Sequence, residues 1–244
     1  ESYVAARDGA FELPVPEDVD FDGLCALLYT SGTTSMPKGV KLTNGAITGY
    51  VMGSNDAASG EDMGRMALAA PLYHIAGVTS MLNALYSGRI VVLLPQFEAA
   101  AWIETVQKHS VTHAFLVPTM LARVMEADNF SMAAFEGMDA ITYGAAPMPP
   151  SVIRRAITVF PENVSFAGAY GQAETTSTVA VLDPDDHRVD GTESEKALKL
   201  KRLSSVGKVL DDVEVRIVDE AGLPVELEVL GEVQLRTFRA MDGY

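Results

Sequence analysis

The segment HAFLVPTMLARVMEA, residues 113–127, contains the two patterns on which this protein is built. Residues 113–117 form a short apolar run, which is typical of a buried strand. Residues 118–127 have the apolar spacing of an amphipathic helix. The segment therefore predicts a strand that leads directly into a helix.

The same alternation extends from residue 24 to about residue 182. Short apolar runs predict further buried strands over 24–29, 66–70, 89–94, 140–143 and 164–167. Helical patterns lie between several of them, over 43–58, 75–86, 99–109 and 150–160. Strands and helices in alternation predict an α/β fold with a mostly parallel sheet covered by helices on both faces. Ligands bind to such sheets at the loops that leave the carboxyl ends of the strands.

The pattern changes after residue 182. Residues 183–205 are polar, and Thr192 followed by Glu195 forms a capping box that predicts a short charged helix over 193–203. Alternating residues at 213–217 and 231–236 then predict antiparallel strands, the start of a small β subdomain. We expect an α/β core over 1–204 and this β subdomain over 205–244.

Composition excludes several classes of protein. The 244 residues carry a net charge of −15, and 48% of them are apolar, so the chain can form a core and is not disordered. Such a negative charge argues against nucleic acid or an anionic membrane as the main partner. The single cysteine, Cys25, suggests a reducing, cytoplasmic location. No apolar run is long enough to span a bilayer, no signal peptide is evident, and nothing indicates the oligomeric state.

The loop after strand 24–29 has the composition of an anion site. It reads TSGTTSMPKG, residues 30–39, with five hydroxyl side chains, two glycines and Lys38. The window 23–55 contains no Asp or Glu, whereas the average composition of the chain would place about four or five there. Backbone N–H groups, hydroxyls and a lysine together suit a phosphate group.

This loop is not a Walker A loop. Gly32 and Lys38 have the required spacing, but Pro37 stands in place of the second glycine and Gly39 in place of the magnesium-binding hydroxyl. On these residues alone, a turn without a ligand remains an alternative.

Three further loops follow predicted strands. They are Pro71-Leu-Tyr-His74, Gly144-Ala-Ala-Pro147 and Tyr170-Gly-Gln-Ala-Glu-Thr175. Each also has a structural interpretation when taken alone: His74 as a helix cap or core residue, 144–147 as an ordinary turn, and Glu174 as a surface acid.

The four loops, in this order, resemble the motifs of the adenylate-forming superfamily, which includes acyl-CoA synthetases, nonribosomal adenylation domains and luciferases. The resemblance implies that Lys38, His74 and Glu174 serve catalysis, with His74 beside the acyl pocket, and that Glu174 and Thr30 bind Mg²⁺. It further implies that ATP is bound by Thr30, Ser31, Gly32, Thr33, Thr34, Ser35, Lys38, Gly144, Ala145, Ala146, Pro147, Tyr170, Gly171, Gln172, Ala173, Glu174 and Thr175. Ser35 and Ala173 depart from the usual glycine and threonine of these motifs.

The function implied is the ATP-dependent activation of a carboxylic acid to an acyl-adenylate with release of pyrophosphate, followed by thioester formation with CoA. Members that use amino acids usually place an Asp in the segment around 71–77 to pair with the ammonium group. Residues 65–97 contain no Asp. An unpaired buried ammonium would be costly, so a fatty or aromatic acid is favoured.

The resemblance also implies that the chain is a truncated core of the large N-terminal domain. The ribose-binding Asp, the hinge and the mobile C-terminal domain with its catalytic Lys would then lie outside it, and the fragment would bind nucleotide without completing catalysis.

Other interpretations remain open. One is a catalytically silent module that binds nucleotide or acyl-adenylate, which the departures at Ser35 and Ala173 would suit. Others are an adenylation domain of a larger synthetase and a phosphate-binding α/β scaffold with different chemistry. His109 and His113 have the spacing of a helical metal pair but lack the Glu of H-E-x-x-H, so structural roles are favoured for both.

Overall fold

The computed structural model describes residues 19–30 and 36–244. The strands are β1 Leu24–Thr30, β2 Lys38–Thr43, β3 Arg65–Leu68, β4 Ile90–Leu93, β5 His113–Leu116, β6 Ala140–Gly144, β7 Ser165–Gln172, β8 Ser177–Leu182, β9 Lys208–Val209, β10 Glu214–Val218 and β11 Glu232–Arg236. The helices are α2 Asn44–Ser54, α3 Ile75–Tyr86, α4 Ala99–His109, α5 Pro118–Glu126, α6 Pro150–Val159, α7 Pro184–His187 and α8 Glu193–Arg202. Two 3₁₀ turns, η1 Met132–Phe135 and η2 Ala173–Thr175, complete the described elements.

The main sheet has seven strands in the order β4-β3-β5-β6-β7-β8-β9. Strands β4 to β7 in this order are parallel, and β8 and β9 are antiparallel to their neighbours. The change of direction follows from connection length: η2 is short enough to join a hairpin, whereas a parallel neighbour needs a long crossover. The α/β fold with a mostly parallel sheet is therefore confirmed.

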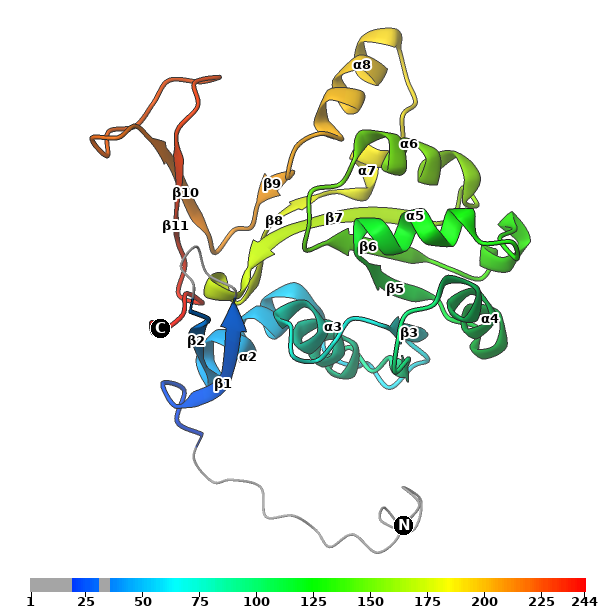
Figure 1. Ribbon diagram of the computed structural model, residues 1–244, viewed down its shortest axis with the longest axis horizontal. Helices are drawn as coiled ribbons and strands as arrows, with labels where there is room; N and C mark the ends of the chain where they lie inside the picture. The colour runs from blue at the N-terminus through cyan, green and yellow to red at the C-terminus, as the bar shows by residue number, and fades with distance from the viewer. Residues whose placement is uncertain (1–18, 31–35) are drawn as a thin grey trace, which may run out of the picture.

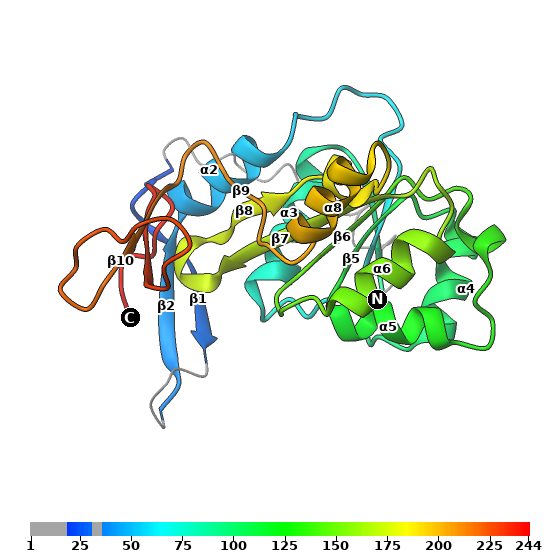
Figure 2. The same ribbon diagram turned by 90° about the horizontal axis from the view of Figure 1, so that it is seen from above.

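Successive strand residues face opposite sides of this sheet, and the two sides are covered differently. One side packs an apolar core, including Ala67 and Ile141, against α4, α5 and α6, which group together in Figure 2. On the other side, Leu68 and Phe115 belong to a smaller cluster that includes residues of α3. Both faces are thus covered by helices, but only the first carries the large continuous core.

The first strand corrects one expectation. We predicted residues 24–29 as a buried strand leading through a loop into a helix, yet β1 pairs antiparallel with β2 in a separate two-stranded sheet. Within β1 only Leu28 is buried. The apolar run did predict a strand, but it could not say which sheet the strand joins, and β2 has no apolar run of its own. The last described pair of this β1–β2 hairpin is Thr30 opposite Lys38.

Two predictions for the later part of the chain are confirmed. Thr192 and Glu195 form the capping box of α8, with both reciprocal bonds present. β10 and β11 pair antiparallel and project away from the main sheet, beside the β1–β2 end of the molecule (Figure 1). β9 pairs with β8 in the main sheet, and the division of the chain at residue 204 stays a prediction. Among the described residues, no helix has both the length and the apolar character to cross a membrane.

Candidate active site

A cavity of about 710 Å³ opens where the β1–β2 hairpin meets the carboxyl ends of the parallel strands. We call it the front cavity. The predicted site residues that line it are Thr30, Lys38, His74, Ala145, Gly171, Gln172, Ala173 and Glu174. The hairpin, α3, β6 and η2 thus bring together residues that lie far apart in the sequence. Five predicted residues of the loop, Ser31, Gly32, Thr33, Thr34 and Ser35, lie outside the described residues.

His74 enters the front cavity from the start of α3. It is the N-cap residue, but its side chain makes no capping hydrogen bond, so its imidazole is not used to hold the helix. The chain turns tightly before it, and the His74 N–H donates to the Pro71 carbonyl at 3.1 Å. Gly77 permits this turn, because a Cβ there would lie 2.2 Å from the Pro71 carbonyl oxygen.

A second cavity of about 350 Å³, the side cavity, adjoins the first. Its lining includes the whole loop over 144–147, which is predicted to bind ATP, together with Tyr170 and Gly171. Ala145 and Gly171 line both cavities. Gly144 lies so close to β7 that a Cβ would stand 2.3 Å from the Ala169 carbonyl oxygen. Ala145 adopts a left-handed backbone with φ 64°, which is unfavourable for a non-glycine residue and needs support from its surroundings. Small residues are therefore required where the two cavities meet.

Glu174 and Lys38 approach each other across Tyr244. The Tyr244 hydroxyl donates to Glu174 Oε1 at 3.2 Å, and Lys38 Nζ lies 4.8 Å from the centroid of the same ring. Desolvation first, and then the charge of Glu174, raise the pKa of Tyr244, so the phenol keeps the proton that it donates. No pattern in the sequence pointed to Tyr244, because its partners precede it by a long stretch of chain.

The segment that carries Tyr244 also joins the two halves of the site. The Met241 N–H donates to the Glu174 carbonyl at 2.8 Å, and the Asp242 N–H donates to the Lys41 carbonyl at 3.0 Å. The Lys41 N–H in turn donates to the Gly243 carbonyl at 3.1 Å. Residues 241–243 therefore act as a backbone bridge between β2 and η2.

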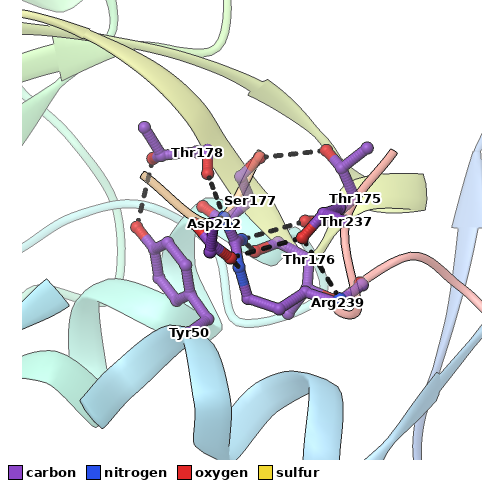
Figure 3. Close-up of polar contacts among 8 residues, drawn as sticks. All are labelled: Tyr50, Thr175, Thr176, Ser177, Thr178, Asp212, Thr237 and Arg239. Atoms are coloured by element: carbon purple, nitrogen blue, oxygen red, sulfur yellow. Dashed lines mark hydrogen bonds and ion pairs between the residues drawn. The ribbon is translucent and has the colours of Figure 1, made fainter. Parts of the chain in front are cut away.

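Arg239 precedes this bridge and lies at the centre of a network of polar contacts with Asp212 and residues 175–178 (Figure 3). Its side chain is only 2% exposed and binds Asp212 through two nitrogens, at 2.6 Å from Nε and 3.1 Å from Nη2. The remaining donors reach the carbonyl oxygens of Thr175, Thr176 and Thr178 at 3.2 to 3.3 Å. The guanidinium also lies 5.2 Å from the ring centroid of Tyr50.

This network holds a strained turn directly after Glu174. Thr176 and Ser177 both have positive φ, at 51° and 77°, in a region that favours glycine. Arg239 donates hydrogen bonds to the Thr175 and Thr176 carbonyls of this turn. Its hydrogen bond to Asp212 keeps the pKa of that carboxyl group below the usual value, so the carboxylate is ionised. No sequence pattern pointed to Arg239 or Asp212, since a single Arg and a single Asp in a charged region carry no distinguishing signal.

One predicted residue lies apart from the cavities. The Thr175 side chain is buried and bonds to the carbonyls of Gln172 and Ser177, both at 3.3 Å, and it lines neither the front nor the side cavity. Its contact with nucleotide stays a prediction.

The front cavity offers suitable groups for Mg²⁺. Glu174 and Thr30 both line it, and carboxylate and hydroxyl oxygens are ligands of the kind that Mg²⁺ prefers, usually together with substrate phosphates. Lys38, which lines the same cavity, adds a positive charge. The arrangement can therefore neutralise a polyphosphate.

Tyr143, which lines the side cavity, is hydrogen-bonded to a buried histidine, His187. The His187 Nδ1–H donates to the Asp183 carbonyl at 2.8 Å, so Nε2 accepts a hydrogen bond from the Tyr143 hydroxyl, also at 2.8 Å. Burial lowers the pKa of His187 and raises that of Tyr143 to about 12. Both groups are neutral in the folded protein.

Acid should therefore destabilise the fold through His187. Because the folded state has the lower pKa, the unfolded state binds more protons, and the free energy of unfolding should fall as the pH drops below about 6.5. Urea unfolding at pH values between about 5 and 8, a range that brackets the ordinary pKa of histidine, measures this change in the free energy of unfolding. His187→Gln should flatten the pH dependence. The slope that remains comes from His113, whose pKa is also lowered by burial, and from carboxyl groups with lowered pKa values such as Asp212. An unchanged slope in the variant would contradict this role.

The chain is similar to one protein-family model and to several proteins of known activity. The family model described as AMP-binding enzyme matches residues 2–244. A feruloyl-CoA synthase from Amycolatopsis sp is 30% identical over 97% of this chain and 45% of its own length, and the 2-succinylbenzoate–CoA ligase of Bacillus subtilis is 27% identical over 98% and 45%. The chain thus spans about half the length of these curated relatives.

Solved structures agree with this fold. The o-succinylbenzoate CoA synthetase of Bacillus subtilis, in complex with ATP and a magnesium ion, has a TM-score of 0.77 and 28% identity, covering 96% of this chain and 46% of that one. The amide bond synthetase McbA from Marinactinospora thermotolerans has a TM-score of 0.80 and 28% identity, with 96% and 44% covered.

Proposed function

Because the chain belongs to the AMP-binding enzyme family, we propose that the whole protein is an acid–thiol ligase that converts a carboxylic acid to its acyl-adenylate and then to a CoA thioester. The observation that carries this proposal is the front cavity, where Lys38, His74 and Glu174 converge from three loops. The relatives whose names specify CoA ligases, and the related structure that holds ATP and magnesium, support it.

The first step needs no general base. A carboxylic acid is ionised at neutral pH, so its oxygen can attack the α-phosphorus of ATP, forming a new P–O bond as the bond to pyrophosphate breaks. The obstacle is repulsion between two anions. Lys38 would bind and stabilise the phosphate charge that develops, and Thr30 and Glu174 would hold Mg²⁺, which supplies further neutralising charge when bound.

The nucleotide base would occupy the side cavity. Gly144, Ala145, Ala146 and Pro147 present backbone and small side chains there, and Tyr170 offers an aromatic face. Ala145 and Gly171 would then mark the passage to the phosphates, because they line both cavities.

In the second step, the sulfur of CoA would attack the acyl carbonyl and AMP would leave. His74, at the start of α3 and without a capping bond, would stand beside the acyl group. The absence of Asp from residues 65–97 supports a fatty or aromatic acid without an α-amino group. We also propose a cytoplasmic location, supported by the single free cysteine, Cys25, and we expect no nucleic-acid partner.

Pyrophosphate exchange tests the adenylation step. The full-length protein should move labelled pyrophosphate into ATP only when a suitable carboxylic acid is present, because the exchange requires reversible formation of the acyl-adenylate. A panel of fatty and aromatic acids, with a reaction lacking acid as the control, identifies the class. If ATP binds and no acid supports exchange, the protein is instead a nucleotide-binding module.

A further inference from the structure

The backbone turn after Glu174 decides where its carboxylate lies. Thr176 and Ser177, which follow η2, have φ values of 51° and 77°. Residues with a Cβ adopt this left-handed region only at a cost, so contacts from the surrounding structure must hold the turn. Whatever holds the turn therefore also holds Glu174, just before it in the chain.

Arg239 meets this turn with its whole guanidinium group (Figure 3). Arginine has five N–H donors, and Arg239 has five acceptor atoms within hydrogen-bond distance. They are the carbonyl oxygens of Thr175, Thr176 and Thr178 and the two carboxylate oxygens of Asp212. The protein itself thus satisfies the guanidinium, and the side chain is engaged in holding the turn rather than in binding a ligand.

The main chain next to Arg239 adds two further contacts. The Met241 N–H donates to the Glu174 carbonyl at 2.8 Å, and the Thr176 hydroxyl donates to the Arg239 carbonyl at 2.6 Å. The carbonyl of Glu174 and the two that follow it are therefore all bound by residues 239–241. This fixes the main chain of Glu174 relative to that segment.

Arg239 is in turn fixed by elements outside the front cavity. Asp212 precedes β10 and Arg239 follows β11, so their ion pair closes the base of the β10–β11 hairpin. From α2, the Tyr50 ring lies 5.2 Å from the guanidinium, and the Tyr50 hydroxyl donates to Thr178 Oγ1 at 3.1 Å. Asp212, Arg239 and Tyr50 do not line the front cavity. They can affect chemistry there only through the residues that they hold.

Charge is balanced within this network. Asp212 binds Arg239 through both carboxylate oxygens, so the two opposite charges lie together and their fields largely cancel at a distance. An effect of Arg239 on a metal ion in the front cavity would therefore come from the position of Glu174, not from the positive charge of the guanidinium.

We propose that Arg239, held by Asp212, is a positioning residue for Glu174: it keeps the turn after η2 in the conformation that presents the carboxylate to Mg²⁺ in the front cavity. The inference rests on the proposed function, because that function assigns Mg²⁺ to Glu174. Mg²⁺ requires near-ideal octahedral geometry, so a displaced ligand oxygen weakens its binding.

Arg239→Lys tests this role without turnover. Isothermal titration calorimetry on the full-length protein measures the dissociation constant of ATP with Mg²⁺ and, in EDTA, without it; the ratio is the gain from Mg²⁺. Lysine cannot reach the same set of acceptors, so the gain should be about tenfold smaller, as for residues that orient metal ligands. ATP binding in EDTA should not change, because Lys38 is untouched. Arg236→Lys, the same change in an exposed ion pair of the hairpin, should keep the full gain.

Ser177→Gly separates geometry from charge. Glycine adopts positive φ without strain, so this second change should restore part of the gain that Arg239→Lys loses. The Thr79 hydroxyl, 3.1 Å from Ser177 Oγ, keeps its bond to the Ile75 carbonyl at 2.8 Å. No recovery would show that Arg239 does not act through the turn. Each variant is titrated where urea unfolding shows it to be folded, and Asp212→Asn, which should also reduce the gain, serves if Arg239→Lys does not fold.

Glu174→Ala distinguishes the possible failures. It should reduce the gain from Mg²⁺, and adding Arg239→Lys to it should change nothing more, because both act through one carboxylate. If Glu174→Ala reduces the gain but folded Arg239→Lys keeps it, the inference alone is wrong. If the unaltered protein shows no gain, the assignment of Mg²⁺ to Glu174 is wrong and the inference falls with it. Pyrophosphate exchange in the unaltered protein tests the proposed function separately.

Discussion

Arg239→Ala should lower the free energy of unfolding by about 3 to 5 kcal/mol, the range seen when one partner of a buried ion pair is removed. The side chain is 2% exposed, and its loss leaves Asp212 and the carbonyls of Thr175, Thr176 and Thr178 without their donors. Two of those carbonyls, of Thr175 and Thr176, belong to the turn with positive φ, which would then lose these two hydrogen bonds. Urea unfolding of the variant measures the change.

Arg236→Ala provides the matched control. Arg236 pairs with Glu214, but both side chains are largely exposed, at 78% and 69%, and an exposed pair contributes about 1 kcal/mol or less. The loss of stability in Arg239→Lys should lie between the losses in Arg239→Ala and Arg236→Ala, because lysine keeps the charge but lacks the planar set of donors of arginine. Equal losses in Arg239→Ala and Arg236→Ala would show that the buried network does not stabilise the fold.

Lys38→Ala should weaken ATP binding about tenfold to a hundredfold, because hydrogen bonds to charged groups contribute about 1.5 to 3 kcal/mol. Glu174→Ala should weaken the dependence of ATP binding on Mg²⁺. Titration of each variant with ATP, with and without Mg²⁺, separates the two effects. Tyr244 contacts both side chains, so each variant must first be shown to unfold with a normal urea midpoint.

Lys41→Ala is the control for this pair of variants. Lys41 lies on β2, three positions from Lys38, yet it does not line the front cavity. The Lys41→Ala variant should bind ATP with the affinity of the unaltered protein. A loss of affinity in Lys41→Ala equal to that in Lys38→Ala would mean that the general positive charge of the hairpin, rather than Lys38 itself, binds the phosphates.

Local patterns predicted the helices well and the strand pairing less well. The bounds of α3 and α4 agree with the predicted helices over 75–86 and 99–109, because amphipathic spacing is a property of the segment itself. Strand partners depend on the rest of the chain. The apolar run of β1 was therefore assigned to the wrong sheet, and β8, whose register is determined by β7, was missed.

The site shows the same division. Loops 71–74, 144–147 and 170–175 could be proposed because each follows a predicted strand, and most of their predicted residues line the front or the side cavity. Tyr244, Arg239 and Asp212 could not be found in this way. Their positions depend on how the last strands fold back on the β1–β2 hairpin, a long-range arrangement that no local pattern records.

The backbone bridge over 241–243 has a consequence for the order in which the protein is assembled. Lys41 and Gly243 are roughly 200 residues apart, and contacts of such sequence separation form slowly and late in folding. During synthesis, β2 leaves the ribosome long before its partner in the bridge exists. The parallel sheet can therefore form before the bridge does, and the bridge between β2 and η2 is completed only after residues 241–243 have been synthesised.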